Sequence, residues 1–155
     1  MKMQDPVPLN VHGVLIDPNT DTQIVVLRDK ENTEVLPIWV GTTEGTSIRL
    51  ALEEVIPPRP MSHDLIMDFA ELLGFRFTKV IVNEVKNNTY YSRLYLTSQD
   101  GERVIDCRPS DAIAMAIRAK IPIFVMPDIL EQKGSQNIDS WLTKLDPNAF
   151  DQHKS

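Results

Sequence analysis

Two short segments of the chain combine an arginine, a proline, a serine and an acid just where a helix is expected to begin. The first is RPMSHDL, residues 59–65, and the second is CRPSDAI, residues 107–113. Each supplies a guanidinium that can contact a phosphate and a carboxylate that can accept hydrogen bonds. Helix starts also favour anions, because their first amides lack carbonyl partners. Both segments are therefore candidates for phosphate chemistry.

Three acids, Glu44, Asp64 and Asp111, lie near expected helix starts. Mg²⁺ needs only one or two carboxylates in addition to water and substrate phosphates. A bound ion could activate water for phosphodiester hydrolysis. The pattern therefore predicts these acids as catalytic residues and as ligands for Mg²⁺ or Mn²⁺. Taken alone, each acid is explained more simply by its favourable interaction with the positive end of a helix.

Basic and hydroxyl side chains accompany these acids. His63 could act as a general acid or base near neutral pH, although a histidine at this position is more often a surface residue. Arg59 and Arg108 are predicted to contact phosphate, and the alternative for each is an ion pair with a neighbouring carboxylate. Ser110 is predicted to cap its helix and to contribute to substrate binding.

A polar and aromatic row on one expected strand offers a further contact for a substrate. Tyr91, Arg93 and Tyr95 alternate with apolar residues, so their side chains share one face. Such a row can stack bases, and Arg93 is included among the predicted substrate-binding residues. A well-paired strand surface is the commoner explanation of this pattern.

Length, charge and cysteine content limit the class of protein. The 155 residues suit one domain. The net charge of −6 argues against broad, tight binding of phosphates, but a local basic groove can exist on an acidic molecule. The N-terminus lacks a secretion signal, and the single cysteine excludes an intrachain disulfide. A cytoplasmic location is therefore expected.

Strand and helix signals alternate along the first half of the chain. Three strands are expected at residues 9–17, 22–29 and 34–40, because Val, Ile and Leu dominate these runs and turn residues separate them. A helix capped by Thr42 or Thr43 should follow and extend to about residue 55. A second helix, capped by Ser62, should bury an apolar face made of Leu65, Phe69, Leu72 and Leu73.

A three-stranded meander is expected next, with two-residue turns at 87–88 and 100–101. This register places Glu84 opposite Tyr91, Tyr95 opposite Asp106 and Arg93 opposite Arg108. The core face of the meander then includes Leu94, Leu96 and Cys107. The other face collects the polar row and, by alternation, Val80 and Val82.

The second half ends with a helix and a strand. A helix capped by Ser110 should run to about Lys120 and be buried nearly all round, and a strand should follow at 121–126. The fold class is therefore α+β, with a mixed or antiparallel sheet, a meander in the C-terminal half and a few packed helices. Residues 1–133 are assigned to one domain, and residues 134–155 to a short helix and a tail.

Four segments together resemble the bifunctional nuclease domain family. They are LPIWVGTTEGTSIRLALE, PPRPMSHDLI, NNTYYSRLYL and DCRPSDAIAMAIRAKIPIFV, within a resemblance that extends from about Val7 to Leu130. The resemblance implies an α+β fold, assembly into a homo-oligomer and degradation of RNA and DNA. The positions that match the family pattern are Glu44, Arg59, Pro60, His63, Asp64, Asp106, Arg108, Pro109, Ser110 and Asp111. This chain has Ser62 where threonine is usual, and Gly45 and Thr46 where alanine is common.

The leading hypothesis is therefore a metal-assisted nuclease that acts on RNA or DNA. Glu44, Asp64 and Asp111 would bind the metal, His63 would transfer a proton, and Arg59 and Arg108 would contact phosphate. The first alternative is a non-enzymatic oligomeric module that binds a small anion or a protein partner. In a second alternative, the two Arg-Pro segments only build the fold and an oligomer interface, and their charged residues are buried in mutual hydrogen bonds.

Overall fold

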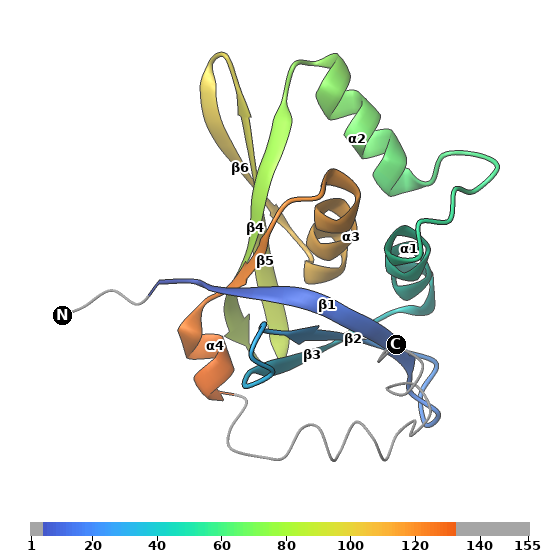
Figure 1. Ribbon diagram of the computed structural model, residues 1–155, viewed down its shortest axis with the longest axis vertical. Coiled ribbons are helices and arrows are strands. Elements are labelled where there is room, and N and C mark those ends of the chain that lie inside the picture. The colour runs from blue at the N-terminus through green and yellow to red at the C-terminus, as the bar shows by residue number, and fades with distance from the viewer. Residues whose placement is uncertain (1–4, 133–155) are drawn as a thin grey trace.

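A mixed β-sheet flanked by helices forms the framework of the chain (Figure 1). The structure is a computed structural model and describes residues 5–132. In that part of the chain the seven strands of the sheet are β1 (Val7–Ile16), β2 (Gln23–Arg28), β3 (Val35–Val40), β4 (Arg76–Lys86), β5 (Thr89–Ser98), β6 (Gly101–Cys107) and β7 (Ile123–Val125). The helices are α1 (Thr42–Leu52), α2 (Ser62–Leu72), α3 (Pro109–Ala119) and α4 (Pro127–Gln132).

The order of strands in the sheet is β3-β2-β1-β7-β4-β5-β6. Strands β4 and β7 are parallel, and the other neighbouring pairs are antiparallel. This arrangement confirms the predicted α+β class with a mixed sheet. None of the helices in residues 5–132 is long and apolar enough to cross a membrane. The short helix predicted within residues 134–155 lies outside the described residues.

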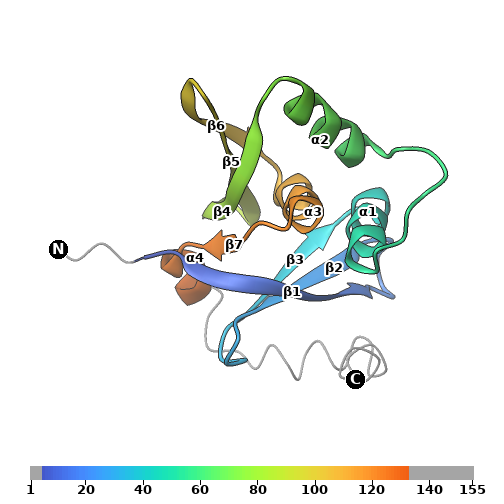
Figure 2. The ribbon, with the colours of Figure 1, turned by 45° about the horizontal axis from the view of Figure 1, so that its top comes forward.

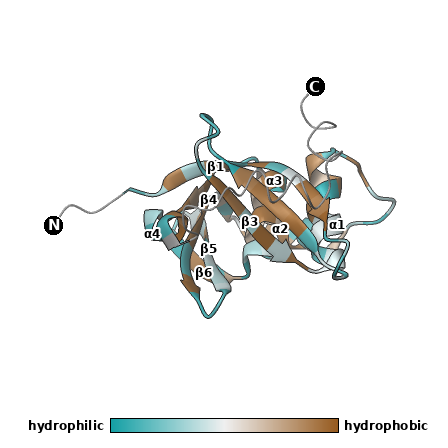
Figure 3. Cartoon of the chain, turned by 90° about the horizontal axis from the view of Figure 1, so that it is seen from below, coloured by the Kyte–Doolittle hydropathy of each residue, from teal (hydrophilic) through white to brown (hydrophobic). Residues whose placement is uncertain are grey.

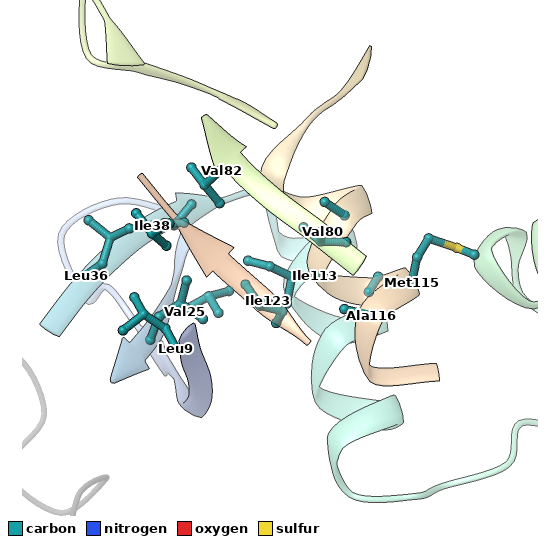
Figure 4. Close-up of a cluster of buried hydrophobic side chains, with 14 of the residues drawn as sticks. Leu9, Val25, Leu36, Ile38, Val80, Val82, Ile113, Met115, Ala116 and Ile123 are labelled. Carbon is teal, nitrogen blue, oxygen red and sulfur yellow. The ribbon is translucent and has the colours of Figure 1, made fainter. Parts of the chain in front are cut away.

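Helix α3 packs between the sheet and helices α1 and α2 (Figure 2). Its alanines allow the strands to approach closely, and Ile113 is completely buried against residues such as Val80 and Ile123 (Figure 4). In Figure 3 the strands are largely hydrophobic and the turns between them hydrophilic, as expected for a sheet covered by helices. Burial of α3 is not complete, because Asp111, Ile117 and Arg118 remain half-buried.

The register of the meander is partly as predicted. Asn87 and Asn88 have φ values of 51° and 62° and form the predicted turn, and Glu84 lies opposite Tyr91. The second turn was predicted wrongly. Ser98 pairs with Gly101, so Arg93 lies opposite Asp106 rather than Arg108, and Tyr95 opposite Val104 rather than Asp106. The positive φ of 114° falls on Gly101 alone, whereas a turn made of residues 100 and 101 would need it at both positions.

Val80 and Val82 lie on the core face of the sheet, contrary to the prediction. Strand β4 has irregularities between Phe77 and Lys79 and again between Val82 and Glu84. An extra residue in a strand moves the following side chains to the opposite face. Both valines are therefore fully buried. Simple alternation from Glu84 could not detect such a bulge.

The helix starts are shifted from their predicted positions. The N-caps are Gly41, Met61 and Arg108, and none makes a side-chain capping hydrogen bond. The predicted caps lie one or two positions inside their helices: Thr42 or Thr43, Ser62 and Ser110. Pro109 occupies the first helical position of α3, where its missing N–H is not needed.

Gly45 departs from the usual family pattern for a steric reason. A Cβ atom at this position would lie 2.9 Å from Cβ of the buried Gln23, a separation too short for two carbon atoms. The Gln23 side chain therefore occupies the space that an alanine Cβ would need.

The apolar face of α2 is not buried as predicted. Leu65, Phe69, Leu72 and Leu73 are 52%, 58%, 82% and 68% exposed. The helix instead contacts the rest of the chain through the face that carries His63, Met67 and Ala70. The sequence pattern therefore identified an amphipathic helix but not the surface against which it packs.

Polar contacts at the start of α2 fix this helix on α3. Oδ2 of Asp64 accepts a hydrogen bond from the Met61 amide at 2.9 Å, and Oδ1 accepts one from Nε of Arg118 at 2.9 Å. Burial alone would raise the pKa of Asp64, but the bonds from Met61 and Arg118 outweigh it and lower the pKa below its usual value. The Asp64 carboxylate therefore stabilises the folded chain while it is ionised.

We expect Asp64→Asn to lower the free energy of unfolding at pH 7 by about 1 kcal/mol, because it removes a charged hydrogen-bond acceptor that is partly exposed. The contribution of Asp64 is complete above its unfolded pKa of about 4 and is lost as the pH falls through the lower folded pKa. The difference from the wild type should therefore shrink in acid. Urea unfolding at pH 7 and pH 3 measures it, with Asp68→Asn, an exposed position one turn along α2, as the control. A difference that is the same at both pH values would contradict this account.

Candidate functional site

Side chains at and beyond the starts of α1, α2 and α3 form a continuous chain of polar contacts. Helix α1 contributes Glu44 and Ser47, which lie three positions apart and so share one face. Helix α2 contributes His63 from its first turn, and α3 contributes Asp111 and Arg118, two turns apart. Arg108, the N-cap of α3, completes the set. We call these six residues the helix-start cluster: Glu44, Ser47, His63, Arg108, Asp111 and Arg118.

The buried half of the cluster is a relay of three hydrogen bonds. Nη2 of Arg118 donates to Oγ of Ser47 at 3.1 Å. Oγ of Ser47 lies 2.8 Å from Nδ1 of His63, and Nε2 of His63 lies 3.0 Å from Oδ1 of Asp111. Because Arg118 can only donate, the serine hydroxyl is free to donate to Nδ1, and Nε2–H then donates to Asp111. Ser47 is 3% exposed and His63 is 8% exposed, so the relay is closed to solvent at this end.

The open half of the cluster is centred on the Arg108 guanidinium. Its Nε and Nη2 donate to the two carboxylate oxygens of Asp111 at 3.0 and 3.2 Å, and Nη1 donates to Oε1 of Glu44 at 3.2 Å. The Arg108 side chain is 64% exposed. A guanidinium has five N–H groups, so two remain for another ligand.

The electrostatics of Asp111 follow from these contacts. Burial alone would raise its pKa, but the hydrogen bonds from Arg108 and His63 and the charge of Arg108 outweigh burial and hold the pKa of Asp111 below its usual value. Hydrogen bonds to Asp111 raise the pKa of Arg108 further, so both groups are ionised at neutral pH. Asp111 therefore serves as a fixed negative charge that holds Arg108 by two parallel hydrogen bonds.

A cavity of about 320 Å³ lies beside the open half of the cluster. Its lining residues come from β3 and the start of α1, from the β4–β5 turn and from the start of α3. Glu44, Arg108 and Ser110 form the part of this lining that can do chemistry. The second alternative considered above requires Arg108 to be buried without an open cleft. The Arg108 side chain is instead largely exposed beside a cavity, which contradicts that alternative.

The structure brings together only some of the predicted site residues. Glu44, His63, Arg108 and Asp111 are joined by hydrogen bonds, and Ser110 lines the adjacent cavity. Arg59 is exposed in the α1–α2 connection, and its side chain forms no hydrogen bond or ion pair with residues 5–132. Arg93 is exposed on the face of β5 opposite to the buried Ser92 and Leu94.

Asp64 does not join Glu44 and Asp111. Its oxygens accept hydrogen bonds from the Met61 amide and from Arg118, whereas Glu44 and Asp111 are both bonded to Arg108. No group of three His, Cys, Asp or Glu side chains in the described part of the chain is arranged to hold a metal ion. The donor set thus does not fit the predicted three-carboxylate site. Glu44 and Asp111 contact the same guanidinium, and Mg²⁺ could bind them through Oε2 of Glu44 and the Asp111 lone pairs that Arg108 and His63 do not use.

Two members of the cluster were missed in the sequence, Ser47 and Arg118. Ser47 lies one turn after Glu44, and Arg118 lies two turns after Asp111 on the same face of α3. This helical spacing was the available signal. Both residues were overlooked because the apolar residues of their helices were explained by packing alone.

Comparison with known proteins relates the chain to a family of nucleases. The family model of the bifunctional nuclease domain matches residues 25–137. An uncharacterized protein of Mycobacterium tuberculosis is 33% identical over 126 residues, which are 81% of this chain and 75% of that protein.

Plant proteins with an assigned activity are also similar. Bifunctional nuclease 1 of Oryza sativa subsp. japonica is 33% identical over 114 residues, 71% of this chain and 34% of the rice protein. Bifunctional nuclease 2 of Arabidopsis thaliana is 31% identical over 121 residues, 75% of this chain and 36% of that protein. The chain thus spans about a third of the length of these plant nucleases. The match of the family model over most of the chain shows that it belongs to the bifunctional nuclease domain family.

Proposed function

We propose that this chain is a nuclease that hydrolyses phosphodiester bonds of RNA or DNA at the open half of the helix-start cluster. The observation that carries the proposal is the Arg108 guanidinium, which Asp111 and Glu44 fix beside an open cavity while most of it stays exposed. Family membership and the names of the plant relatives support the reaction class.

Arg108 is the group proposed to contact the scissile phosphate. Its two remaining N–H groups can donate to a non-bridging oxygen, where negative charge develops during hydrolysis. A donor that is already oriented needs no rearrangement in the transition state. Asp111 provides this orientation through its two bonds to Arg108, and His63 holds Asp111 in turn.

Glu44 is the group proposed to orient the attacking water and to accept its proton. Only Oε1 is bonded to Arg108, and Oε2 makes no hydrogen bond to residues 5–132. This role replaces the direct proton transfer predicted for His63. Both ring nitrogens of His63 are engaged, so the proposal gives it a positioning role through Asp111.

The proposal keeps a divalent cation, but with Glu44 and Asp111 as its ligands and without Asp64. Glu44 and Asp111 carry two negative charges and Arg108 one positive charge, so the open half of the cluster has a net charge of −1, counted from the ion pairs. An anionic substrate is repelled by such a cluster. Mg²⁺ or Mn²⁺ held by Glu44 and Asp111 would reverse this charge and act as a Lewis acid on the phosphate.

We also propose a cytoplasmic location for this activity. The support is the cysteine content, since Cys107 is the only cysteine of the chain and is half-buried. Burial raises the pKa of its thiol, so Cys107 is unreactive and fits a packing role.

The nuclease proposal is tested by the rates at which purified protein cuts single-stranded RNA and DNA. We expect Arg108→Gln and Glu44→Gln each to lower the rate by about a hundredfold or more, because each removes a group that acts directly on the phosphate or the water. His63→Gln should lower the rate less, because it only loosens Asp111. Activity should be lost in EDTA and restored by Mg²⁺ or Mn²⁺.

Arg76→Gln is the matched control, since Arg76 is an exposed arginine at the start of β4, outside the cluster. Circular dichroism of each variant shows whether it folds. Rates for Arg108→Gln and Glu44→Gln equal to that of the control would contradict the assignment. Undiminished cleavage in EDTA would remove the metal from the proposal while leaving Arg108 and Glu44 in place.

An oligomeric state is proposed on a separate observation, the exposed apolar face of α2. Large side chains on this helix are exposed: Leu65, Ile66, Phe69, Leu72 and Leu73. An apolar groove of about 490 Å³ lies between α2 and strands β4 to β6, and Val104 and Ile105 of β6 are also about half exposed. Apolar patches of this kind mark association surfaces. We propose that a second copy of the chain covers this one.

We expect the wild type to elute as a dimer or larger assembly and Phe69→Glu to shift towards the monomer, because a charge on this face would be buried without a partner. Size-exclusion chromatography with light scattering at several concentrations measures the mass. Glu71→Lys, an exposed change on the same helix, is the control. A wild type that stays monomeric at the highest concentration would contradict this assembly.

A further inference from the structure

The cavity beside the helix-start cluster has aromatic as well as charged lining residues. Trp39 and Tyr90 line it together with Asn88, Arg108 and Ser110. We propose that it is a nucleotide subsite, in which one unpaired base of the substrate stacks on the aromatic side chains and the adjacent phosphate binds at the start of α3. This inference rests on the nuclease proposed above and specifies its substrate as single-stranded nucleic acid.

Trp39 is the residue expected to stack with the base. It is 44% exposed, although the other five residues of β3 are all buried. Its indole also interacts with the Asp17 carboxylate and helps to lower the pKa of that carboxylate. An exposed indole in an otherwise buried strand is a ready platform for stacking.

Tyr90 supplies a second aromatic surface to the cavity, from a segment distant in sequence from Trp39. It is half-buried at the start of β5, directly after the turn that contains Asn88. Burial raises the pKa of its phenol, which keeps the ring uncharged over the physiological range. Two aromatic rings from distant parts of the sequence therefore line one cavity next to a guanidinium.

The opposite end of the cavity offers donors to a phosphate. The Ser110 residue is 6% exposed, lines the cavity, and its hydroxyl makes no hydrogen bond to the described residues. The first amide of α3 that bonds to a carbonyl is that of Ala112, so the amides of Ser110 and Asp111 precede the helical ladder. The Ser110 hydroxyl and these two amides are donors that an oxygen-rich anion such as phosphate could accept at the helix start.

The size of the cavity limits how much of a nucleic acid can enter it. A volume of about 320 Å³ is at the lower end of the range for small-molecule pockets and suits one nucleotide. A base inside a duplex could not enter without leaving its stack, which costs free energy. Single strands, loops and frayed ends are therefore the favoured substrates.

Binding of adenosine 5′-monophosphate tests the subsite without any cleavage, because this compound has no phosphodiester bond. The fluorescence of Trp39 reports the stacking directly in a Trp141→Phe background, which leaves Trp39 as the only tryptophan. We expect adenosine 5′-monophosphate to quench Trp39. Ribose 5-phosphate, which lacks the base, should bind about tenfold more weakly or worse, the usual loss when base stacking is removed.

Tyr90→Leu keeps the apolar bulk of the side chain but removes the aromatic face, and should weaken binding of adenosine 5′-monophosphate several-fold. Tyr91→Leu is the matched control, because Tyr91 is the next residue of β5, is exposed, and does not line the cavity. Equal binding of the two phosphates, equal effects of the two tyrosine substitutions, or no quenching would each overturn the subsite.

The two proposals fail in different ways. Cleavage of RNA or DNA without binding of adenosine 5′-monophosphate would leave the nuclease in place and remove the subsite. Binding with the expected selectivity but without any cleavage would remove the nuclease and leave a nucleotide-binding site.

Discussion

The buried relay from Arg118 through Ser47 and His63 to Asp111 is the constraint on which the rest of the structure depends. It joins three helices through polar groups that are largely removed from water. An unsatisfied buried donor or acceptor costs about 1–3 kcal/mol. Loss of any one group of the relay would therefore destabilise the fold, because its neighbour would lack a hydrogen-bond partner. The helix starts can therefore meet in only a narrow range of positions. That restriction also fixes Arg108 at the edge of the cavity.

The relay has the composition of a catalytic triad, but its geometry indicates a different use. Ser47 is almost inaccessible and already accepts a hydrogen bond from Arg118, so it cannot attack a substrate. The exposed end of the relay is Asp111, and its oxygens hold a guanidinium. The buried polar groups thus act as a support for Arg108. A preorganised donor of this kind is what hydrolysis of a charged phosphodiester requires.

Much of this arrangement followed from the sequence, and the remainder depended on contacts between distant segments. Apolar runs and turn residues located every strand and helix in residues 5–132 except α4, and the acids and arginines at helix starts pointed to the site. Alternation could not detect the irregularities of β4 that bury Val80 and Val82. Amphipathic spacing could not reveal that the apolar face of α2 lacks a partner within the chain. Tertiary packing also determines that Asp111 pairs with Arg108 and Asp64 with Arg118, and spacing in the sequence could not predict this.

The most direct test of the account is the hydrogen-bonding state of the His63 ring in the free protein. Nitrogen NMR spectra of the three histidines can be assigned with a His63→Gln variant. The relay predicts a His63 proton on Nε2 that is protected from exchange, and a change of this signal in both Ser47→Ala and Asp111→Asn. A His63 ring with two rapidly exchanging tautomers, unaffected by either substitution, would contradict the relay and the placement of Arg108 that depends on it.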